Sequence, residues 1–376
     1  MQRSSWIRRL SWSVIAPAVL LVFIGWVGIA RSVALSGTSA RLVERQMLWT
    51  AVCLGAMFLA TLPNYRALAR YSYAALAVSV VLLVAVFWFP SVNGAQRWIR
   101  FGPIGLQPSE FAKLAFVLAL ARWLRHRDSY RRLAGLLVPL ALVMVPMLLI
   151  LKEPDLGTAL VFLPVLFMIL FAAGARREHL ALLALVAVAT LPLLWSQMSR
   201  EQKSRITALA QQTAAHQRPT DDGYQLHQAK QMLALGGWGG SFLGGEVTPD
   251  RAVYYVPEPH TDSIAVVLGE RFGLVGWAVV LSLFLVLIWR LLAVAQATRE
   301  PFGRLTAIGI AALLGTQVLI NMGMLVGALP ITGLALPLVS YGGSSLLANC
   351  LGLGLALNIG LRPGYEVANE PFRFAE

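Results

Sequence analysis

The sequence contains few charged residues and few cysteines. Only 13% of its 376 residues are charged, two are cysteines, and 57% are hydrophobic. A chain of this length with so little charge is too apolar for a soluble globular protein. Cys53 and Cys350 both lie in apolar stretches, so the sequence predicts no disulfide framework and assigns both thiols to packing.

The sequence also lacks the short motifs of several well-known enzymes and transporters. It has no G-x-x-x-x-G-K-[ST] loop, no H-E-x-x-H pair and no G-x-S-x-G turn, and its five histidines are scattered. ATP-driven transport and zinc proteolysis therefore lose their main support. No internal repeat is visible, which weakens a common signature of secondary transporters.

Long apolar runs are what the sequence has instead. The mean hydropathy is +0.68, and a membrane-spanning helix needs roughly 20 predominantly apolar residues. The chain is therefore predicted to be an all-α, polytopic membrane protein with about ten transmembrane helices. We expect a single domain over residues 1–376, with a large loop at 196–262 between the seventh and eighth helices. The predicted spans are 11–31, 46–62, 69–90, 109–124, 134–151, 157–173, 179–196, 263–292, 305–328 and 342–361.

Acidic residues are outnumbered by basic ones, 18 against 31, which gives a net charge of +13. If the N-terminus is cytoplasmic, the arginines concentrate in the inner segments and few fall in the short outer loops, as the positive-inside rule requires. Both termini are therefore predicted to be cytoplasmic and the 196–262 loop to be extracytoplasmic. Topology and an anionic inner leaflet explain most of the basic excess, so no nucleic-acid partner is expected.

The large loop has two parts of different composition. Residues 198–231 are polar and have a helical pattern, whereas 235–250 are rich in glycine. The first part is predicted to be helical and the second to be flexible or tightly turning.

The end of this loop reads PEPHTD, and its last residue, Asp262, stands where the next apolar run begins. A carboxylate at the boundary between lipid and water is costly unless it has a task, so Asp262 is a candidate functional residue. Alternatively, Thr261 or Asp262 caps the incoming helix. Glu270 lies two turns further on and should seek a partner; Arg271 is the nearest candidate if the helix is locally distorted.

A second polar group lies in NGAQRWIRFGPIGLQPSEFAKL, residues 93–114. A helix is predicted to begin at Pro108 or Ser109, which places Glu110 in its first turn and Lys113 on the same face, where the two can pair. The pair either contacts substrate or only lets the helix tolerate its charges.

The residues before that helix are Arg97, Trp98 and Arg100. They are typical of an aromatic and cationic anchor at the membrane interface. Arginine also offers a planar set of donors that suits phosphate oxygens, so the group alternatively binds a phosphate.

The segment KEPDLGT, residues 152–158, interrupts the apolar sequence between two spans. Pro154 ends the first run, and Asp155 is placed near the start of the following helix, where the helix dipole favours a negative charge. Asp155 is either a helix cap or a ligand for a cation or a sugar hydroxyl.

The stretch from Pro330 to Ser345, within NMGMLVGALPITGLALPLVSYGGSS, is predicted to be a re-entrant or broken element. Such backbone survives at membrane depth only where protein buries it or where it lines a wet cavity. It should therefore help to form the cavity that Asp262 faces. Ser340 and Ser344 are candidate hydrogen-bonding residues there, or plain helix caps.

Four motifs, NGAQRWIRFGPIGLQPSEFAKL, PDLGTALV, PEPHTD and LPLVSYGGSS, occur in this order on the expected spans. With them, nearly the whole chain resembles the SEDS family (shape, elongation, division and sporulation), and the RodA branch more than the FtsW branch. The family plan is ten helices with a large outer loop between the seventh and eighth.

The resemblance implies a peptidoglycan glycosyltransferase that polymerises lipid II during cell elongation, on the outer face of the bacterial inner membrane. It also implies a class B penicillin-binding transpeptidase as partner, besides lipid II and the nascent glycan strand. The family's essential aspartate falls on Asp262, and its other sensitive positions fall on Trp98, Glu110, Lys113 and Asp155.

The chemistry expected from this resemblance is an inverting glycosyl transfer from a lipid-diphosphate donor. Asp262 would act as general base on the acceptor hydroxyl. Arg97, Arg100 and Lys113, or a divalent cation (Mg²⁺ or Mn²⁺) held by Asp155 or Glu110, would stabilise the diphosphate. The full set of expected substrate-binding residues is Arg97, Trp98, Arg100, Glu110, Lys113, Asp155, His260, Ser340 and Ser344.

Two alternatives use the same polar groups differently. A flippase for a lipid-linked precursor needs the cavity and the cations but no base, and a scaffold would only hold the penicillin-binding protein. Because the charged motifs cluster on the outer side, the pattern favours an enzyme. The sequence departs from the family at Ser263, where Phe is usual, and at Arg271, where a second acid is usual.

Overall fold

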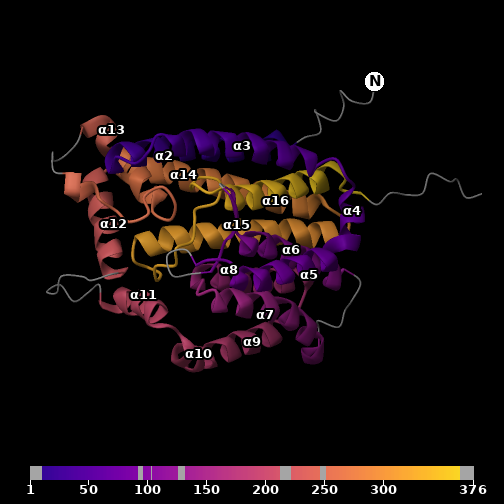
Figure 1. Ribbon diagram of the computed structural model, residues 1–376. Helices are drawn as coiled ribbons and strands as arrows, with labels where there is room; N and C mark the ends of the chain where they lie inside the picture. Colours follow the sequence, from indigo (N-terminus) through magenta and orange to yellow (C-terminus); the bar gives the residue numbers. More distant parts are fainter. Residues whose placement is uncertain are drawn as a thin grey trace, which may run out of the picture.

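The computed structural model describes residues 11–91, 96–102, 104–125, 132–211, 222–245 and 251–364. Long, roughly parallel helices form one bundle, and three short helices gather at one end of it (Figure 1). The apolar runs form helices because a helix satisfies its own backbone hydrogen bonds where no water is available.

All ten predicted spans are helical. In the described part of the chain, nine helical stretches are long and apolar enough to cross a membrane. The tenth predicted span is α6, which has 17 residues and carries Glu110 and Lys113. Seven spans consist of one helix each: α2 (Trp12–Ser36), α3 (Arg41–Leu59), α6 (Pro108–Leu124), α8 (Leu156–Ala173), α14 (Ile264–Ala297), α15 (Pro301–Leu325) and α16 (Gly343–Leu361). Three spans consist of consecutive helical pieces: α4 (Tyr65–Leu68), η1 (Ala69–Tyr71), α5 (Ser72–Ala85) and η2 (Val86–Trp88); η4 (Leu133–Leu136) and α7 (Leu137–Lys152); and α9 (Arg177–Ala189) and α10 (Leu191–Gln197).

The bundle is built around α15. Most of this helix is buried, and it packs against α14, α8, α6 and α16. Small residues permit this close packing; a Cβ on Gly309 would collide with Val117 of α6. In contrast, α9 and α10 have no buried residue and lie at the edge of the bundle (Figure 1).

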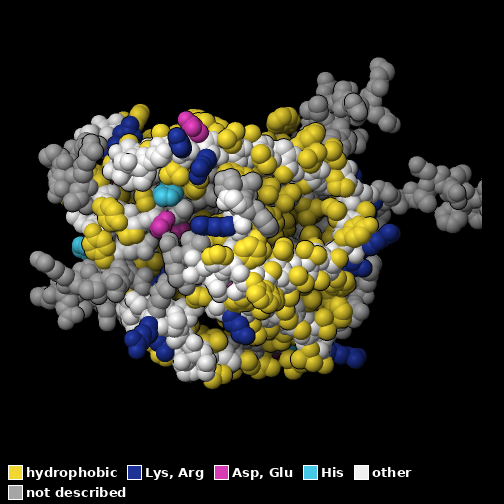
Figure 2. Space-filling model, in the orientation of Figure 1, with side chains coloured by type: hydrophobic (Ala, Val, Ile, Leu, Met, Phe, Trp, Pro, Cys, Tyr) yellow, Lys and Arg dark blue, Asp and Glu magenta, His cyan; other side chains and the backbone are white. Residues whose placement is uncertain are grey.

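The two ends of the bundle differ in the segments that they carry. The loop end carries α11 (Arg200–Gln211), α12 (Asp222–Gly236) and α13 (Gly240–Gly244), while α4 lies at the opposite end (Figure 1). Figure 2 shows hydrophobic side chains over the middle of the visible face, with Lys and Arg side chains toward both ends. This apolar belt between charged ends is the surface expected of a polytopic membrane protein.

The polar part of the large loop is helical where the structure describes it: α11 lies within it, and α12 runs from it to Gly236. Residues 212–221 and 246–250 of the loop lie outside the described residues. The glycine-rich part has a tight turn, with a positive φ of 71° at Gly240, but it also contains the short helix α13. This turn packs into a kink in α14 at Gly273, where Leu274 N donates to Gly237 O at 2.9 Å. The loop thereby replaces a helix hydrogen bond that the kink removes.

The partner predicted for Glu270 was wrong. Its carboxylate forms a bidentate ion pair with Arg31 of α2, with distances of 2.7 Å to Nη2 and 3.0 Å to Nε. Arg271 instead lies over the Phe242 ring, at 5.2 Å from the centroid. Successive residues of a helix point in different directions, so α2 reaches Glu270 while Arg271 faces the loop.

A short antiparallel hairpin precedes α6. Strand β1 (Ile99–Phe101) pairs with β2 (Ile104–Leu106), and Arg100 lies opposite Gly105.

Cys53 and Cys350 are both free and buried, as predicted.

Candidate active site

Asp262 lies in the turn that leads into α14. The N-cap of α14 is Ser263, and no side chain caps the helix, so capping by Thr261 or Asp262 is wrong. The turn is held by its neighbours, because Ser263 Oγ donates to Pro257 O at 3.0 Å and Asn321 Nδ2 donates to Asp262 O at 2.9 Å. The Asp262 carboxylate is thus held at the start of α14 without capping the helix.

The segment from residue 330 to 342 is non-helical and largely buried, as predicted for a broken element. It lies against the Asp262 turn: Tyr341 N donates to His260 O at 2.8 Å, and Ser340 Oγ donates to Thr261 O at 2.6 Å. Gly333 has a φ of 66°, and a Cβ on it would lie 3.2 Å from Asp262 Oδ2. Glycine at this position leaves room for the carboxylate.

Four charged side chains act on Asp262, one from its own turn and three from other segments. Burial is the largest cause that raises its pKa, and the negative charges of Glu258 and Asp155 raise it further. The positive charges of Arg205 and Arg97 lower the pKa, but the net result is a pKa of about 7. Asp262 is therefore able to accept a proton near neutral pH.

Asp155 begins α8 as its N-cap. Its Oδ1 accepts a hydrogen bond from Thr158 N at 3.1 Å, and its Oδ2 accepts one from Thr158 Oγ1 at 3.0 Å. The capping interpretation is therefore confirmed. Its charge also reaches Asp262, so the cap and the candidate site share this carboxylate.

Arg97 is fixed at the turn between α7 and α8. Its Nε donates to Glu153 O at 3.1 Å and its Nη2 to Pro154 O at 2.5 Å, while its charge acts on Asp262. Trp98 packs under the hairpin, 3.1 Å from a Cβ built on Gly105, and Arg100 is exposed on β1. Of the three predicted residues, Arg97 is the one whose charge acts on Asp262.

Glu153 was missed as a site residue. Its side chain is fully buried, and neither carboxyl oxygen has a hydrogen-bond partner among the described residues. Burial and, next, the charge of Asp155 raise the pKa of Glu153 to about 8, against the lowering effect of Arg97. Its position between Lys152 and Pro154, at the end of an apolar run, was the available signal.

Arg205 was also missed, and the sequence around it gives no local signal. It lies on α11 in the large loop, more than 50 residues before Asp262 in the chain. Arg205 Nη1 would lie 4.0 Å from a Cβ on Gly333, so it approaches the same glycine as Asp262. Only the fold of the loop places this cation at the site.

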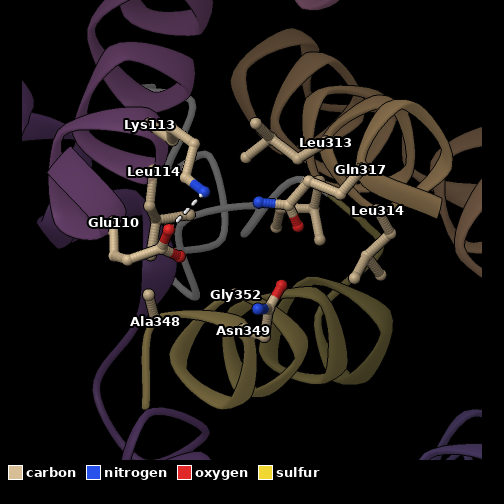
Figure 3. A pocket seen from close by; sticks show the side chains of 10 residues that line it. Glu110, Lys113, Leu114, Leu313, Leu314, Gln317, Ala348, Asn349 and Gly352 are labelled. Atoms are coloured by element: carbon tan, nitrogen blue, oxygen red, sulfur yellow. Dashed lines mark hydrogen bonds and ion pairs between the residues drawn. The ribbon is translucent and has the colours of Figure 1, made fainter. Parts of the chain in front are cut away.

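Glu110 and Lys113 form the predicted ion pair, at 2.8 Å. They line a separate cavity of about 20 Å³ between α6, α15 and α16, together with Gln317 and Asn349 (Figure 3). Glu110 Oε2 and Gln317 Oε1 have no hydrogen-bond partner among the described residues. The cavity has room for about one water molecule, and these polar atoms would bind it.

Ser340 and Ser344 both bond to backbone groups. Ser340 Oγ also accepts from Leu336 N at 2.8 Å, and Ser344 Oγ joins the hairpin to α16 through Gln107 N and Gly105 O, both at 3.1 Å. The His260 ring contacts the Tyr341 ring edge-on, with centroids 5.7 Å apart. Substrate contact by these residues stays a prediction.

The described residues contain no group of three or more His, Cys, Asp or Glu side chains arranged to hold a metal ion. Asp155, which the sequence offers as a cation ligand, already accepts hydrogen bonds at both carboxylate oxygens. Near Asp262, positive charge for an anionic ligand is supplied by Arg97 and Arg205.

The chain is similar to cell cycle proteins over nearly its whole length. The family described as FtsW, RodA and SpoVE cell cycle proteins matches residues 8–362. A probable peptidoglycan glycosyltransferase FtsW of Trichlorobacter lovleyi is 37% identical over 85% of this chain and 84% of its own length. Stage V sporulation protein E of Bacillus subtilis is 33% identical, over 84% and 86%.

Solved structures show the same likeness. The rod shape determining protein RodA of Thermus thermophilus has a TM-score of 0.71 and 31% identity, covering 95% of this chain and 98% of its own. A chain of a peptidoglycan synthase complex that coordinates polymerization and crosslinking has a TM-score of 0.78 and 32% identity, covering 93% and 97%. The protein therefore belongs to the FtsW, RodA and SpoVE family of polytopic membrane proteins, the SEDS family.

Proposed function

We propose that the protein is a peptidoglycan glycosyltransferase that polymerises lipid II. The observation that carries this proposal is the environment of Asp262, a carboxyl group held beside Arg97 and Arg205 with a pKa of about 7. The names of the similar FtsW proteins, which describe peptidoglycan glycosyltransferases, support the same reaction class.

The proposed reaction joins two lipid-linked glycans. Asp262 takes the proton from a sugar hydroxyl of the acceptor, and the hydroxyl oxygen forms a bond to the anomeric carbon of the donor. The bond from that carbon to the lipid diphosphate breaks, and the diphosphate leaves with the electron pair. Attack opposite the leaving group inverts the anomeric configuration. General base catalysis of this kind contributes roughly 10²–10⁴ in rate.

The departing diphosphate needs positive charge in a fixed place. Arg97 is held by two backbone carbonyls at the turn between α7 and α8, and Arg205 approaches Gly333 from the loop. Preorganised cations stabilise charge that develops in the transition state without a reorganisation cost. We assign this role to the two arginines; a divalent cation held by Asp155 or Glu110 stays a prediction.

The charge pattern supports a membrane placement. We propose that both termini are cytoplasmic and that Asp262 lies at the outer face of the bacterial inner membrane, where lipid II is polymerised. A similar chain is part of a peptidoglycan synthase complex that coordinates polymerization and crosslinking. This supports a class B penicillin-binding transpeptidase as the partner.

The test is polymerisation of purified lipid II by the full-length protein in detergent, with and without the penicillin-binding protein. Glycan strands and released lipid diphosphate are expected. If labelled lipid II instead crosses the bilayer of reconstituted vesicles and no polymer forms, the protein is a flippase. If the protein neither polymerises nor moves lipid II but binds the transpeptidase, it is a scaffold.

Assignment to elongation is a finer proposal. The sequence motifs favour the RodA branch, whereas the similar curated proteins carry the FtsW and stage V sporulation names and the similar solved structures include RodA. Depletion of the protein in its own cells distinguishes the roles. Rounded cells are expected for elongation, and filaments would assign the protein to division.

A further inference from the structure

A basic pocket lies at the end of the bundle opposite Asp262. It has a volume of about 490 Å³ and lies between the start of the α4–α5 span and the end of α6. Ligand pockets commonly have volumes of about 300–1,000 Å³. The residues that line it are Arg66, Ala69, Arg70, Tyr73, Arg122, Trp123 and Arg125.

The topology separates this pocket from the candidate active site. Arg125 forms an ion pair with Glu300 at 2.7 Å, and Glu300 is the N-cap of α15. Helix α14, which has 34 residues, runs antiparallel to α15 and ends next to Glu300 in the chain. Asp262 lies just before the first residue of α14, at its other end. Even after its kink at Gly273, α14 extends about 35 Å, so the pocket and Asp262 lie at opposite ends of the bundle.

The guanidinium of Arg122 is fixed in the pocket wall. Its Nη1 donates to the carbonyl oxygens of Ala69, at 2.7 Å, and Arg70, and the group lies over the Tyr73 ring, 4.6 Å from its centroid. Its Nε and Nη2 have no hydrogen-bond partner among the described residues, although an arginine has five N–H donors in all. A fixed guanidinium with donors to spare is suited to receive an anion.

The charge balance of the pocket favours the same ligand. Four arginines line it, and Glu300 pairs with one of them, Arg125, so positive charge is in excess. The Glu300 carboxylate also accepts a hydrogen bond from the Gly303 amide, at 2.6 Å. Arginine forks match the oxygens of a phosphate group. The charged residues of the lining are all arginines, so the pocket offers planar, directional donors.

The position of the pocket indicates where the phosphate comes from. The α4–α5 span begins at Tyr65, and the exposed rings of Tyr71 and Tyr73 stand at its start, as aromatic residues do at the headgroup level of a membrane. Basic pockets between transmembrane helices on the cytoplasmic side bind the headgroups of anionic lipids.

We propose that this pocket binds a phosphate group, and that in the membrane the phosphate belongs to the headgroup of an anionic phospholipid. The acyl chains of such a lipid would lie along the apolar surface of α5. The proposal does not depend on the reaction at Asp262, because the two sites lie at opposite ends of the bundle.

The experiment is native mass spectrometry of the full-length protein, titrated with phosphatidylglycerol and, separately, with phosphatidylcholine. Wild-type protein is expected to retain phosphatidylglycerol in preference to phosphatidylcholine. Arg70→Gln with Arg122→Gln should weaken phosphatidylglycerol binding roughly 30-fold, because each substitution removes one positive charge from the headgroup site. Arg304→Gln is the control, because Arg304 is exposed at the same end but outside the pocket.

A second arm identifies the source of the phosphate. The thermal unfolding temperature of the protein is measured in detergent with added inorganic phosphate, and with sodium chloride of equal ionic strength. Stabilisation by phosphate that Arg70→Gln alone abolishes, without phosphatidylglycerol binding, would support the pocket with a soluble anion as its ligand. Arg70 is exposed, so this single variant should fold.

The proposal is overturned if neither ligand binds, or if the pocket variants bind phosphatidylglycerol as tightly as the Arg304→Gln control does. Equal retention of phosphatidylcholine and phosphatidylglycerol by wild-type protein would also overturn it, because a phosphate site with excess positive charge must prefer a net negative lipid.

Discussion

The two ends of the bundle carry different sets of charged residues. At the loop end, Glu153, Asp155 and Asp262 lie with Arg97 and Arg205. At the opposite end, four arginines line one pocket, and Arg125 among them pairs with Glu300. Most of these residues lie in loops, in short helices or at helix termini, so the difference arises from the segments at the two ends.

This comparison shows which end is able to carry out proton chemistry. Burial and neighbouring negative charges raise the pKa of a carboxyl group toward neutrality, as they do for Asp262 and Glu153. An arginine remains charged at any physiological pH. The loop end therefore combines a proton acceptor with anion-binding groups, while the pocket at the opposite end offers anion-binding groups.

The largest expected effect is on catalysis at the loop end. Asp262→Asn should lower the initial rate of glycan synthesis from lipid II by roughly 10²–10⁴, because an amide cannot accept the hydroxyl proton. Glu258→Gln is the matched control, since Glu258 is an exposed acid in the same loop. If both variants fold and lose the same fraction of the rate, the negative charge of the loop supports the reaction and Asp262 is not a general base.

The next effect tests how the loop end is held together. Glu270→Gln deprives Arg31 of its carboxylate partner at a site where the Glu270 side chain is 1% exposed, so the free energy of unfolding should fall by about 3 kcal/mol. Arg271→Gln, one residue on, removes an interaction with the Phe242 ring worth about 1 kcal/mol. Thermal unfolding in detergent compares them, and a larger destabilisation by Arg271→Gln would contradict the ion pair's role.

Glu153 provides a smaller, pH-dependent effect on stability. Its pKa is raised from 4.5 to about 8, so between these pH values the folded protein keeps a proton that the unfolded chain releases. Wild-type stability should therefore fall as pH rises from 5 to 8. Glu153→Gln, which cannot ionise, should be more stable than wild type at pH 8 by at least about 1 kcal/mol. Identical pH profiles of unfolding would refute a neutral Glu153.

The smallest effect is on the pH dependence of the rate. If Asp262 is the base, activity should rise with pH through about 7, as its carboxyl loses its proton. Arg205→Gln should move this midpoint to higher pH and Glu258→Gln to lower pH, each by less than about one unit, because the two charges act in opposite directions. Midpoints that do not move, measured from kcat/KM, would assign the titration to another group.

Local features of the site were predictable where the physical cause is local. The Glu110 and Lys113 pair follows from their spacing on a helix. The capping role of Asp155 follows from its position between Pro154 and the next apolar run, because a carboxylate there accepts hydrogen bonds from the free N–H groups of the helix start. These interactions span three residues, so sequence spacing alone defines their geometry.

The contacts that surround Asp262 were not predictable in this way. Arg31 and Glu270 are 239 positions apart, and Arg205 reaches the site through a separate loop helix. The choice of Ser263 over Asp262 as the N-cap also depends on the turn that Asn321 and Ser340 hold. No pattern within a single segment encodes contacts of this kind.

The sequence by itself determined the approximate number and bounds of the spans, since the hydrophobic thickness of a membrane sets how many apolar residues each requires. It also determined which acid to examine first, because a carboxylate beside an apolar run is costly. Only the tertiary structure decided that Asp262 is free of capping and that the charges of two arginines act on it. Its pKa depends on burial and on charges from distant segments, and only packing brings those together.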